Sequence, residues 1–164
     1  MTQRLVAETP TGQVRSVGPA HLAAIVARMA RDGRRWTGLV RYDQASRWYR
    51  RLECADTYEI WLLSWLPGQQ TGFHDHGASA GAFAVALGSL SERGVQGARP
   101  RQSPRLIAAG GVRAFGPDYV HDVRNDANRP AVSIHAYSPP LASMRRFEVS
   151  ASGLLRADGE ERWW

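Results

Sequence analysis

Two histidines, His74 and His76, stand one residue apart in the stretch GFHDHG. On a β-strand, residues i and i+2 point to the same face, so both imidazoles can reach one metal ion from a rigid element. His121 follows His76 by 45 residues, a separation typical of a ligand that the fold brings in. Three neutral imidazoles leave other positions of a metal open, as a catalytic site requires. A His-x-His pair alone also occurs in polar turns, so the surrounding pattern has to decide.

The single cysteine, Cys54, limits the kinds of site that the chain can build. One thiol excludes an internal disulfide framework and a thiolate-rich zinc or iron-sulfur site. Any metal must therefore use nitrogen or oxygen ligands. We expect Cys54 itself to be a small buried hydrophobe in a strand.

Length and charge bound the class of protein. A chain of 164 residues predicts one domain over residues 1–164. The net charge is +6, but all 21 basic residues are arginine, which indicates codon usage rather than a phosphate-binding stripe, and we predict no nucleic-acid partner. No apolar run reaches about 18 residues and the N-terminus lacks an apolar leader, which predicts a cytoplasmic protein without a membrane partner.

The elements that must position the histidines change character along the chain. Residues 18–32 carry apolar side chains at a 3.6-residue spacing after Pro19, which predicts a helix, and a second amphipathic stretch follows at 43–52. We therefore expect residues 1–52 to be largely helical. From about residue 58, short β-prone runs alternate with turn residues, which indicates a small β-barrel or sandwich on which the helical segment packs. The terminal pair Trp163 and Trp164 is expected to dock on the protein.

The spacing around the two histidines resembles the first cupin motif. Gly68 precedes His74 by five intervening residues, and Gly88 closes the following strand. The position at which that motif holds glutamate is filled by Gly81. A site without this acid has three neutral ligands, so the ion keeps its full charge, attracts a thiolate or reduced oxygen, and offers one more position to substrate.

The second cupin motif has an approximate match that contains the third histidine. Gly111, Pro117, His121 and Asn125 follow its order. One residue fewer separates Pro117 from His121, and the internal glycine of the motif is missing. The two motifs together imply a mainly β cupin fold, a small jelly-roll-like barrel, with N-terminal α-helices.

Two longer stretches are similar to the cysteine dioxygenase family of thiol dioxygenases, which are cupins without the glutamate. WLPGQQTGFHDHGASAG resembles the metal-binding segment of that family, and SIHAYSPPL resembles its second signature. The resemblance covers roughly residues 45–150. It implies that His74, His76 and His121 bind Fe(II). It also implies that a small thiol and O2 are the substrates.

The second signature places three polar residues at alternate positions. The resemblance implies that Ser133, His135 and Tyr137 form a hydrogen-bonded triad outside the metal ligands. Alternation along a strand puts all three on one face, where buried polar groups must satisfy one another. The alternative is a chain of hydrogen bonds that only orders a barrel interior. Animal members carry a cysteine at the position of Gly81 that joins the tyrosine covalently, and glycine excludes that cross-link here.

The substrate depends on an arginine upstream of the metal motif. In the family, cysteine-specific enzymes bind the substrate carboxylate there, whereas relatives that act on 3-mercaptopropionate commonly have glutamine. Counting back from Trp65 favours Arg50, and a slip of one residue selects Arg51. A guanidinium suits the role because it can donate two parallel hydrogen bonds to a carboxylate.

The resemblance therefore implies an Fe(II) dioxygenase that oxidises L-cysteine to cysteine sulfinate. Cysteine would chelate the ion through thiolate and amine, with its carboxylate on Arg50 and the Tyr137 hydroxyl. Two alternatives stay open. One is a dioxygenase for another small thiol such as 3-mercaptopropionate, and the other is a non-catalytic metal-binding cupin. Zn(II) and Ni(II) also accept imidazole ligands, and the sequence does not give the oligomeric state.

Overall fold

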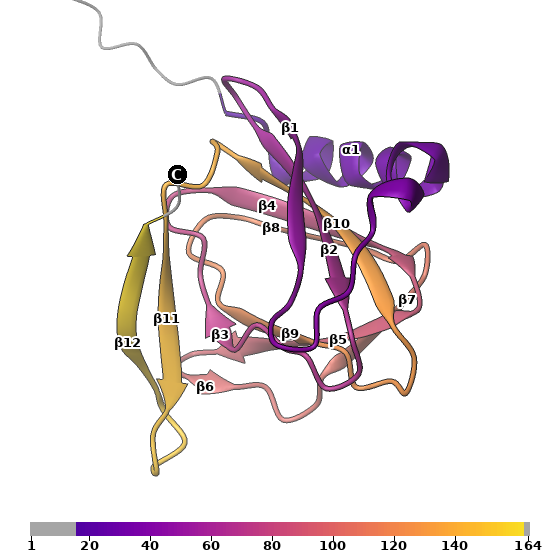
Figure 1. Ribbon diagram of the computed structural model, residues 1–164. Coiled ribbons are helices and arrows are strands. Elements are labelled where there is room, and N and C mark those ends of the chain that lie inside the picture. The colour runs from indigo at the N-terminus through magenta and orange to yellow at the C-terminus, as the bar shows by residue number, and fades with distance from the viewer. Residues whose placement is uncertain (1–15, 163–164) are drawn as a thin grey trace, which may run out of the picture.

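A β-barrel makes up most of the computed structural model, which describes residues 16–162 (Figure 1). Its first sheet has the strand order β1 (Tyr49–Cys54), β2 (Glu59–Trp65), β10 (Ala131–Ser138), β4 (Ala80–Leu87) and β8 (Val112–Phe115). The second has the order β12 (Leu155–Arg162), β11 (Ser143–Val149), β3 (Phe73–His74), β9 (His121–Arg124), β5 (Ser89–Gln96) and β6 (Arg99–Pro100), with β7 (Arg105–Ala108) beside β5. All strand pairs are antiparallel, and the predicted mainly β architecture is confirmed.

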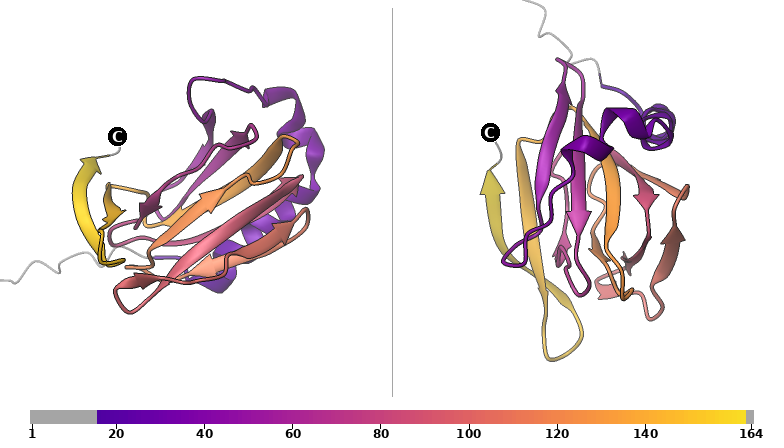
Figure 2. Two further views of the ribbon diagram at one scale, coloured as in Figure 1. Left: turned by 90° about the horizontal axis from the view of Figure 1, so that it is seen from below. Right: turned by 45° about the vertical axis from the view of Figure 1, so that its right-hand side comes forward.

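The helix α1 (Pro19–Arg31) lies across the outer face of the first sheet (Figure 2). It begins with Pro19 in the first turn, where a missing N–H costs no hydrogen bond. The apolar stripe predicted from the sequence is its buried face, formed by Leu22, Ile25, Val26 and Met29. Two short 3-10 turns, η1 (Gly33–Arg35) and η2 (Thr37–Leu39), then lead the chain away. None of the described helices is long and apolar enough to cross a membrane.

The helical part of residues 1–52 is smaller than predicted. Residues 40–48 form neither helix nor strand, and Tyr49–Cys54 is strand β1. The amphipathic pattern at 43–52 is overridden by pairing, because Arg50 and Arg51 lie opposite Leu62 and Trp61 of β2. Cys54 ends this strand and is exposed rather than buried. Predictions for residues 1–15 and for the terminal tryptophan pair fall outside the described residues.

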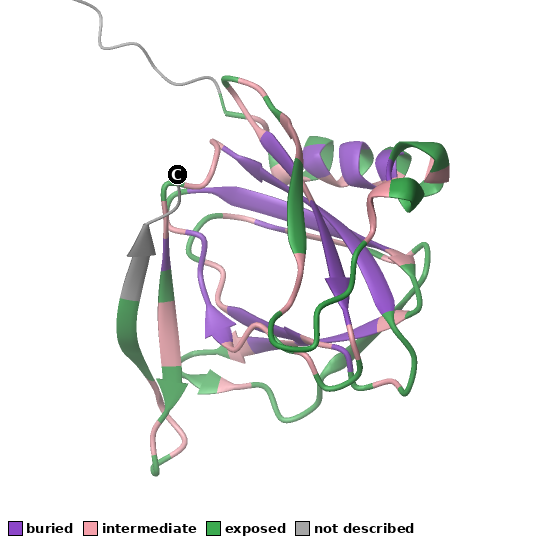
Figure 3. Ribbon diagram, viewed as in Figure 1, coloured by how far each residue is buried: buried purple, intermediate pink, exposed green. Residues whose placement is uncertain are grey.

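Strand β10 separates two apolar cores. Its even-numbered residues Val132, Ile134 and Ala136 pack beneath α1, while Ser133 and the other odd-numbered residues point into the barrel. All eight residues of β10 are buried, and Figure 3 shows the contrast with the exposed edge strand β1. The same alternation in β4 puts Ala82 and Ala84 under the helix and Phe83 and Val85 inside. The first sheet thus presents one face to the helix and the other to the candidate site.

Truncation of the helix stripe is expected to destabilise the fold. Leu22 is completely buried, and Leu22→Ala should lower the free energy of unfolding by about 2–5 kcal/mol through lost burial and a cavity. Leu106→Ala is the matched control, because that leucine is 71% exposed and should change stability by no more than about 0.5 kcal/mol. Urea unfolding measures both values. Equal changes in the free energy of unfolding for the two substitutions would show that the buried face of α1 does not stabilise the fold.

Candidate metal centre

Three buried histidines meet inside the barrel. His74 lies in β3 and His121 in β9, and the two residues are direct partners across that strand pair. His76 follows in the turn after β3, and the ligand atoms of the three side chains lie within 4.8 Å of one another. The structure therefore brings together the residues that the sequence analysis selected as metal ligands, 45 residues apart in the chain.

The residue between the two neighbouring histidines fixes their turn. Asp75 is fully buried and accepts hydrogen bonds from the backbone N–H groups of Gly77, at 3.1 Å, and Arg145, at 3.0 Å. Its other oxygen lies 2.6 Å from Nε of Arg145. These contacts turn Asp75 away from the centre, so that it orders the segment while the imidazoles on either side can share one ion.

The protonation state of these histidines suits metal binding. Burial, together with neighbouring imidazoles, holds the pKa values of His74 and His76 well below the ordinary value, so both rings are neutral near pH 7. Nδ1 of His74 lies 2.9 Å from the carbonyl oxygen of Gly72 and donates to it, which leaves Nε2 for an ion. Nδ1 of His121 lies 2.9 Å from Oε1 of Glu92, with the same consequence.

His76 provides the test of fit for a metal. Among the described residues, neither of its ring nitrogens has a hydrogen-bond partner, although the side chain is buried. Buried polar atoms in native proteins are almost always satisfied, so an orphaned imidazole beside two others needs a further partner. A divalent ion held by His74, His76 and His121 supplies one.

A chain of hydrogen bonds runs along the inner face of β10. Nε1 of Trp65 donates to Oγ of Ser133 at 2.9 Å, Oγ lies 2.8 Å from Nε2 of His135, and Nδ1 of His135 lies 3.2 Å from the Tyr137 oxygen. Ser133 accepts from Trp65 and keeps both its own proton and a second lone pair, so the direction of its contact with His135 follows the tautomer of that ring. In the tautomer with the proton on Nδ1, Ser133 donates to His135 and His135 donates to Tyr137. Trp65 was not placed in this chain of hydrogen bonds from the sequence.

With the His135 proton on Nδ1, the Tyr137 hydroxyl proton is available to a ligand. Burial holds the pKa of His135 well below its ordinary value, so this imidazole is neutral. Burial likewise raises the pKa of Tyr137 far above that of a free phenol, so the hydroxyl stays protonated at neutral pH. In the Nδ1-protonated tautomer of His135, the Tyr137 oxygen accepts from the imidazole and its O–H can donate to a ligand.

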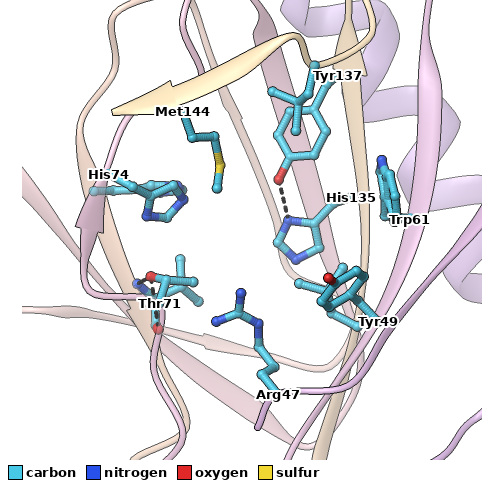
Figure 4. A pocket seen from close by; sticks show the side chains of 12 residues that line it. Arg47, Tyr49, Trp61, Thr71, His74, His135, Tyr137 and Met144 are labelled. Carbon is cyan, nitrogen blue, oxygen red and sulfur yellow. Dashed lines mark hydrogen bonds between the residues drawn. The ribbon is translucent and has the colours of Figure 1, made fainter. Parts of the chain in front are cut away.

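One pocket joins His74 and His121 to this chain of hydrogen bonds (Figure 4). The guanidinium of Arg47 points into the space between His74 and His135. Apart from the polar groups already named and Thr71, the walls are apolar or aromatic: Tyr49, Trp61, Leu63, Val123, Leu141 and Met144. Such a lining, with a few convergent polar groups, is typical of a site for a small organic ligand.

Arg47 is a half-buried cation with spare hydrogen-bonding capacity. Nη1 donates to the carbonyl oxygen of Gln70 at 3.1 Å, and the guanidinium lies 4.8 Å from the centre of the Trp65 ring. Its Nε is buried without a partner within residues 16–159, and no carboxylate of those residues forms an ion pair with it. Burial lowers its pKa, yet an arginine remains charged. The pocket therefore offers an uncompensated positive charge.

Comparison with known proteins agrees with this geometry. The family model described as cysteine dioxygenase type I matches residues 13–150. The chain belongs to the cysteine dioxygenase type I family. Cysteine dioxygenase type 1 of Danio rerio is 31% identical over 124 residues, which cover 69% of this chain and 61% of that protein. The chain thus spans less than two thirds of the length of this curated relative.

Solved structures support the cupin fold. A protein from Thermus thermophilus superposes with a TM-score of 0.56 at 22% identity, over 63% of this chain and 93% of that chain. A cupin superfamily protein from Desulfitobacterium hafniense gives a TM-score of 0.53 at 10% identity, over 63% and 87% of the two chains. The predicted cupin barrel is confirmed, and the three histidines and the β10 signature lie within the segment that matches the cysteine dioxygenase type I family.

The arginines selected from the sequence do not reach the pocket of this family member. Arg50 and Arg51 are both exposed in β1. Arg51 lies over the Trp61 ring, at 5.6 Å, and 3.7 Å from Oε2 of Glu59. The structure instead places Arg47, three residues before Arg50, among the pocket residues. In an extended chain, residues 47, 49 and 51 share one face, and this spacing was the signal available for Arg47. Residues 40–48 form neither helix nor strand, however, so the alternation of β1 could not be extended back to residue 47 in a defined register.

Gly81, where animal members of the family carry cysteine, lies opposite Phe115 of β8 and Tyr137 of β10. A Cβ at this position would lie 2.4 Å from Cε2 of Phe115 and 3.1 Å from Cδ1 of Tyr137. The rings of Phe115 and Tyr137 both stack on His76, with centroids 4.9 and 5.0 Å away. The volume beside Gly81 is therefore filled by Phe115, which helps to hold the histidine that lacks a hydrogen bond. Nothing in the sequence pattern indicated this role.

Proposed function

We propose that this chain is an Fe(II)-dependent thiol dioxygenase that oxidises L-cysteine with O2 to cysteine sulfinate. Membership of the cysteine dioxygenase type I family supports the reaction class. One structural observation carries the proposal further: a three-histidine site without an acid opens onto the pocket that holds the unpaired Arg47 cation. That pairing suits a small ligand with a metal-binding group at one end and a carboxylate at the other.

The metal would be held by His74, His76 and His121. Fe(II) bound there would supply a Lewis acid that favours the ionised thiol and the redox chemistry that activates O2. The protein contributes neutral ligands that leave the charge of the ion uncompensated in the inner sphere. It also contributes largely apolar walls, which limit access of bulk water to the reacting groups.

Arg47 takes the role predicted for Arg50 or Arg51. Its guanidinium can donate two parallel hydrogen bonds to the substrate carboxylate, and its exposure to the pocket makes it available. The Tyr137 hydroxyl is the second donor, because its proton is free and its pKa keeps it protonated. An arginine in this place favours a substrate with a carboxylate over one without it.

His135 holds Tyr137 rather than transferring protons itself. Both of its nitrogens are engaged, one with Ser133 and one with Tyr137, and burial keeps the ring neutral. The chain from Trp65 to Tyr137 therefore fixes a hydroxyl donor at the edge of the pocket. The lack of a nucleic-acid partner and the cytoplasmic location stay predictions from the sequence.

The experiment is oxygen uptake by the protein loaded anaerobically with Fe(II). With L-cysteine we expect oxygen uptake and the formation of one cysteine sulfinate per O2 consumed, because both oxygen atoms become bonded to the substrate sulfur. Turnover should be lower with 3-mercaptopropionate, which lacks the amine. His76→Ala is the control, since it removes one ligand. A higher turnover of 3-mercaptopropionate than of L-cysteine would contradict the proposed substrate. Oxygen uptake no greater than that of His76→Ala would contradict the proposed dioxygenase activity.

A further inference from the structure

A buried carboxylate lies behind one of the metal ligands, outside the pocket. Glu92 of β5 is 3% exposed, and its Oε1 lies 2.9 Å from Nδ1 of His121. Its Oε2 accepts a hydrogen bond of 2.5 Å from Nε of Arg113 in β8. Removing a carboxylate from water is costly, so a sequence keeps one in a barrel wall only where its contacts compensate that cost.

The surroundings of Glu92 are built to hold it. Gly94, two residues further along β5, is the direct partner of His121 in β9. A Cβ at Gly94 would lie only 2.9 Å from the hydroxyl of Tyr119, so the glycine leaves room for that hydroxyl, which lies 3.4 Å from Glu92 Oε1. Three segments thus converge on one carboxylate, whose only metal-ligand contact is His121.

The three ligands differ in what stands behind them. His74 donates to a neutral carbonyl oxygen, and His76 has no partner among the described residues, whereas His121 faces an anion. A carboxylate fixes the tautomer of a metal-bound imidazole, with its other nitrogen toward the ion, and increases its strength as a donor. His121 is therefore the ligand through which the protein can adjust the charge on the metal.

We infer that Glu92 is a positioning residue that supplies, through His121, the negative charge that Gly81 leaves out of the inner sphere. In this arrangement the carboxylate acts through its hydrogen bond with His121 and does not bind the ion itself. It therefore stabilises the charge of the metal without occupying a coordination position that substrate needs. Arg113 limits the effect, because its cation shares the same carboxylate. The inference rests on the metal site of the proposed function.

The test measures binding of Co(II) alone, by titration of the metal-free protein with a visible-absorption readout. Glu92→Gln keeps the shape of the side chain and removes its charge, and should weaken Co(II) binding by roughly 10- to 100-fold. Glu53→Gln is the matched control, since Glu53 also accepts a hydrogen bond, 2.6 Å from Tyr58, away from the site. It should change the affinity less than twofold.

Arg113→Gln separates charge from scaffolding. It leaves the contact between Glu92 and His121 in place and removes the competing cation, so Co(II) affinity should stay equal or increase. A loss as large as that of Glu92→Gln would overturn the inference, because both residues would then act only as structure. So would a folded Glu92→Gln protein, checked by thermal unfolding, that binds Co(II) within twofold of the wild type. If the wild type itself binds no Co(II), the metal site of the proposed function fails instead.

Discussion

Gly81→Glu is expected to lower the free energy of unfolding by about 1–3 kcal/mol and to abolish thiol oxidation. The backbone at Gly81 needs no positive φ, so the cost is steric. The new Cβ would fall 2.4 and 2.5 Å from two ring atoms of Phe115, which must move. Phe115 stacks on His76, so its movement disturbs a metal ligand, and the added acid faces the same interior. Urea unfolding and oxygen uptake with L-cysteine measure the two effects.

Companion variants distinguish the clash from the charge. Gly81→Ala introduces the clash alone and should reproduce the loss of stability. In Gly81→Glu/Phe115→Ala the clash is relieved because the ring is removed, and oxygen uptake should stay lost, because a carboxylate can now compete for the position that substrate needs. The neutral Gly81→Gln/Phe115→Ala protein should regain part of the uptake. Wild-type stability and turnover in Gly81→Glu itself would contradict the explanation.

The histidines and the β10 signature were predictable because their patterns are local. His74 and His76 carry their relation in a spacing of two residues, and Ser133, His135 and Tyr137 share a face by strand alternation alone. The stripe of α1 was predictable for the same reason, with a period of 3.6 residues. A prediction from such patterns needs only the type of element, not its neighbours.

The residues that were missed depend on how strands meet. Glu92 reaches His121 across 29 residues of sequence, and Phe115 fills the space at Gly81 because β8 pairs with β4 in that register. Arg47, the pocket arginine that we propose for the substrate carboxylate, was not selected because the stretch before β1 has no regular structure, so counting back from Trp65 could not locate the pocket face. The type of a single polar or aromatic residue in a strand does not indicate the strand register that brings its side chain to a site.

Arg47→Met is expected to reduce kcat/KM for L-cysteine by roughly 10- to 150-fold, mostly through KM. Loss of a charge-assisted hydrogen-bonded contact costs about 1.5–3 kcal/mol. Methionine keeps an unbranched apolar side chain and removes the guanidinium that lies over the Trp65 ring. Arg50→Met and Arg51→Met are the matched controls, because both arginines are exposed and neither lines the pocket. Each should alter kcat/KM less than twofold. Steady-state oxygen uptake supplies the values.

A substrate without the carboxylate isolates the contact itself. Cysteamine retains the thiol and amine of L-cysteine, so its kcat/KM should hardly differ between the wild type and Arg47→Met. For each thiol, the ratio of kcat/KM in the wild type to kcat/KM in Arg47→Met gives a free-energy change. The difference between these two free-energy changes is the coupling between the Arg47 side chain and the substrate carboxylate, as in a double-mutant cycle. If both thiols lose activity equally, Arg47 supports the fold of the pocket rather than the substrate. If Arg51→Met selectively impairs L-cysteine instead, the register with a slip of one residue, which selects Arg51, is the functional one, and β1 must shift when substrate binds.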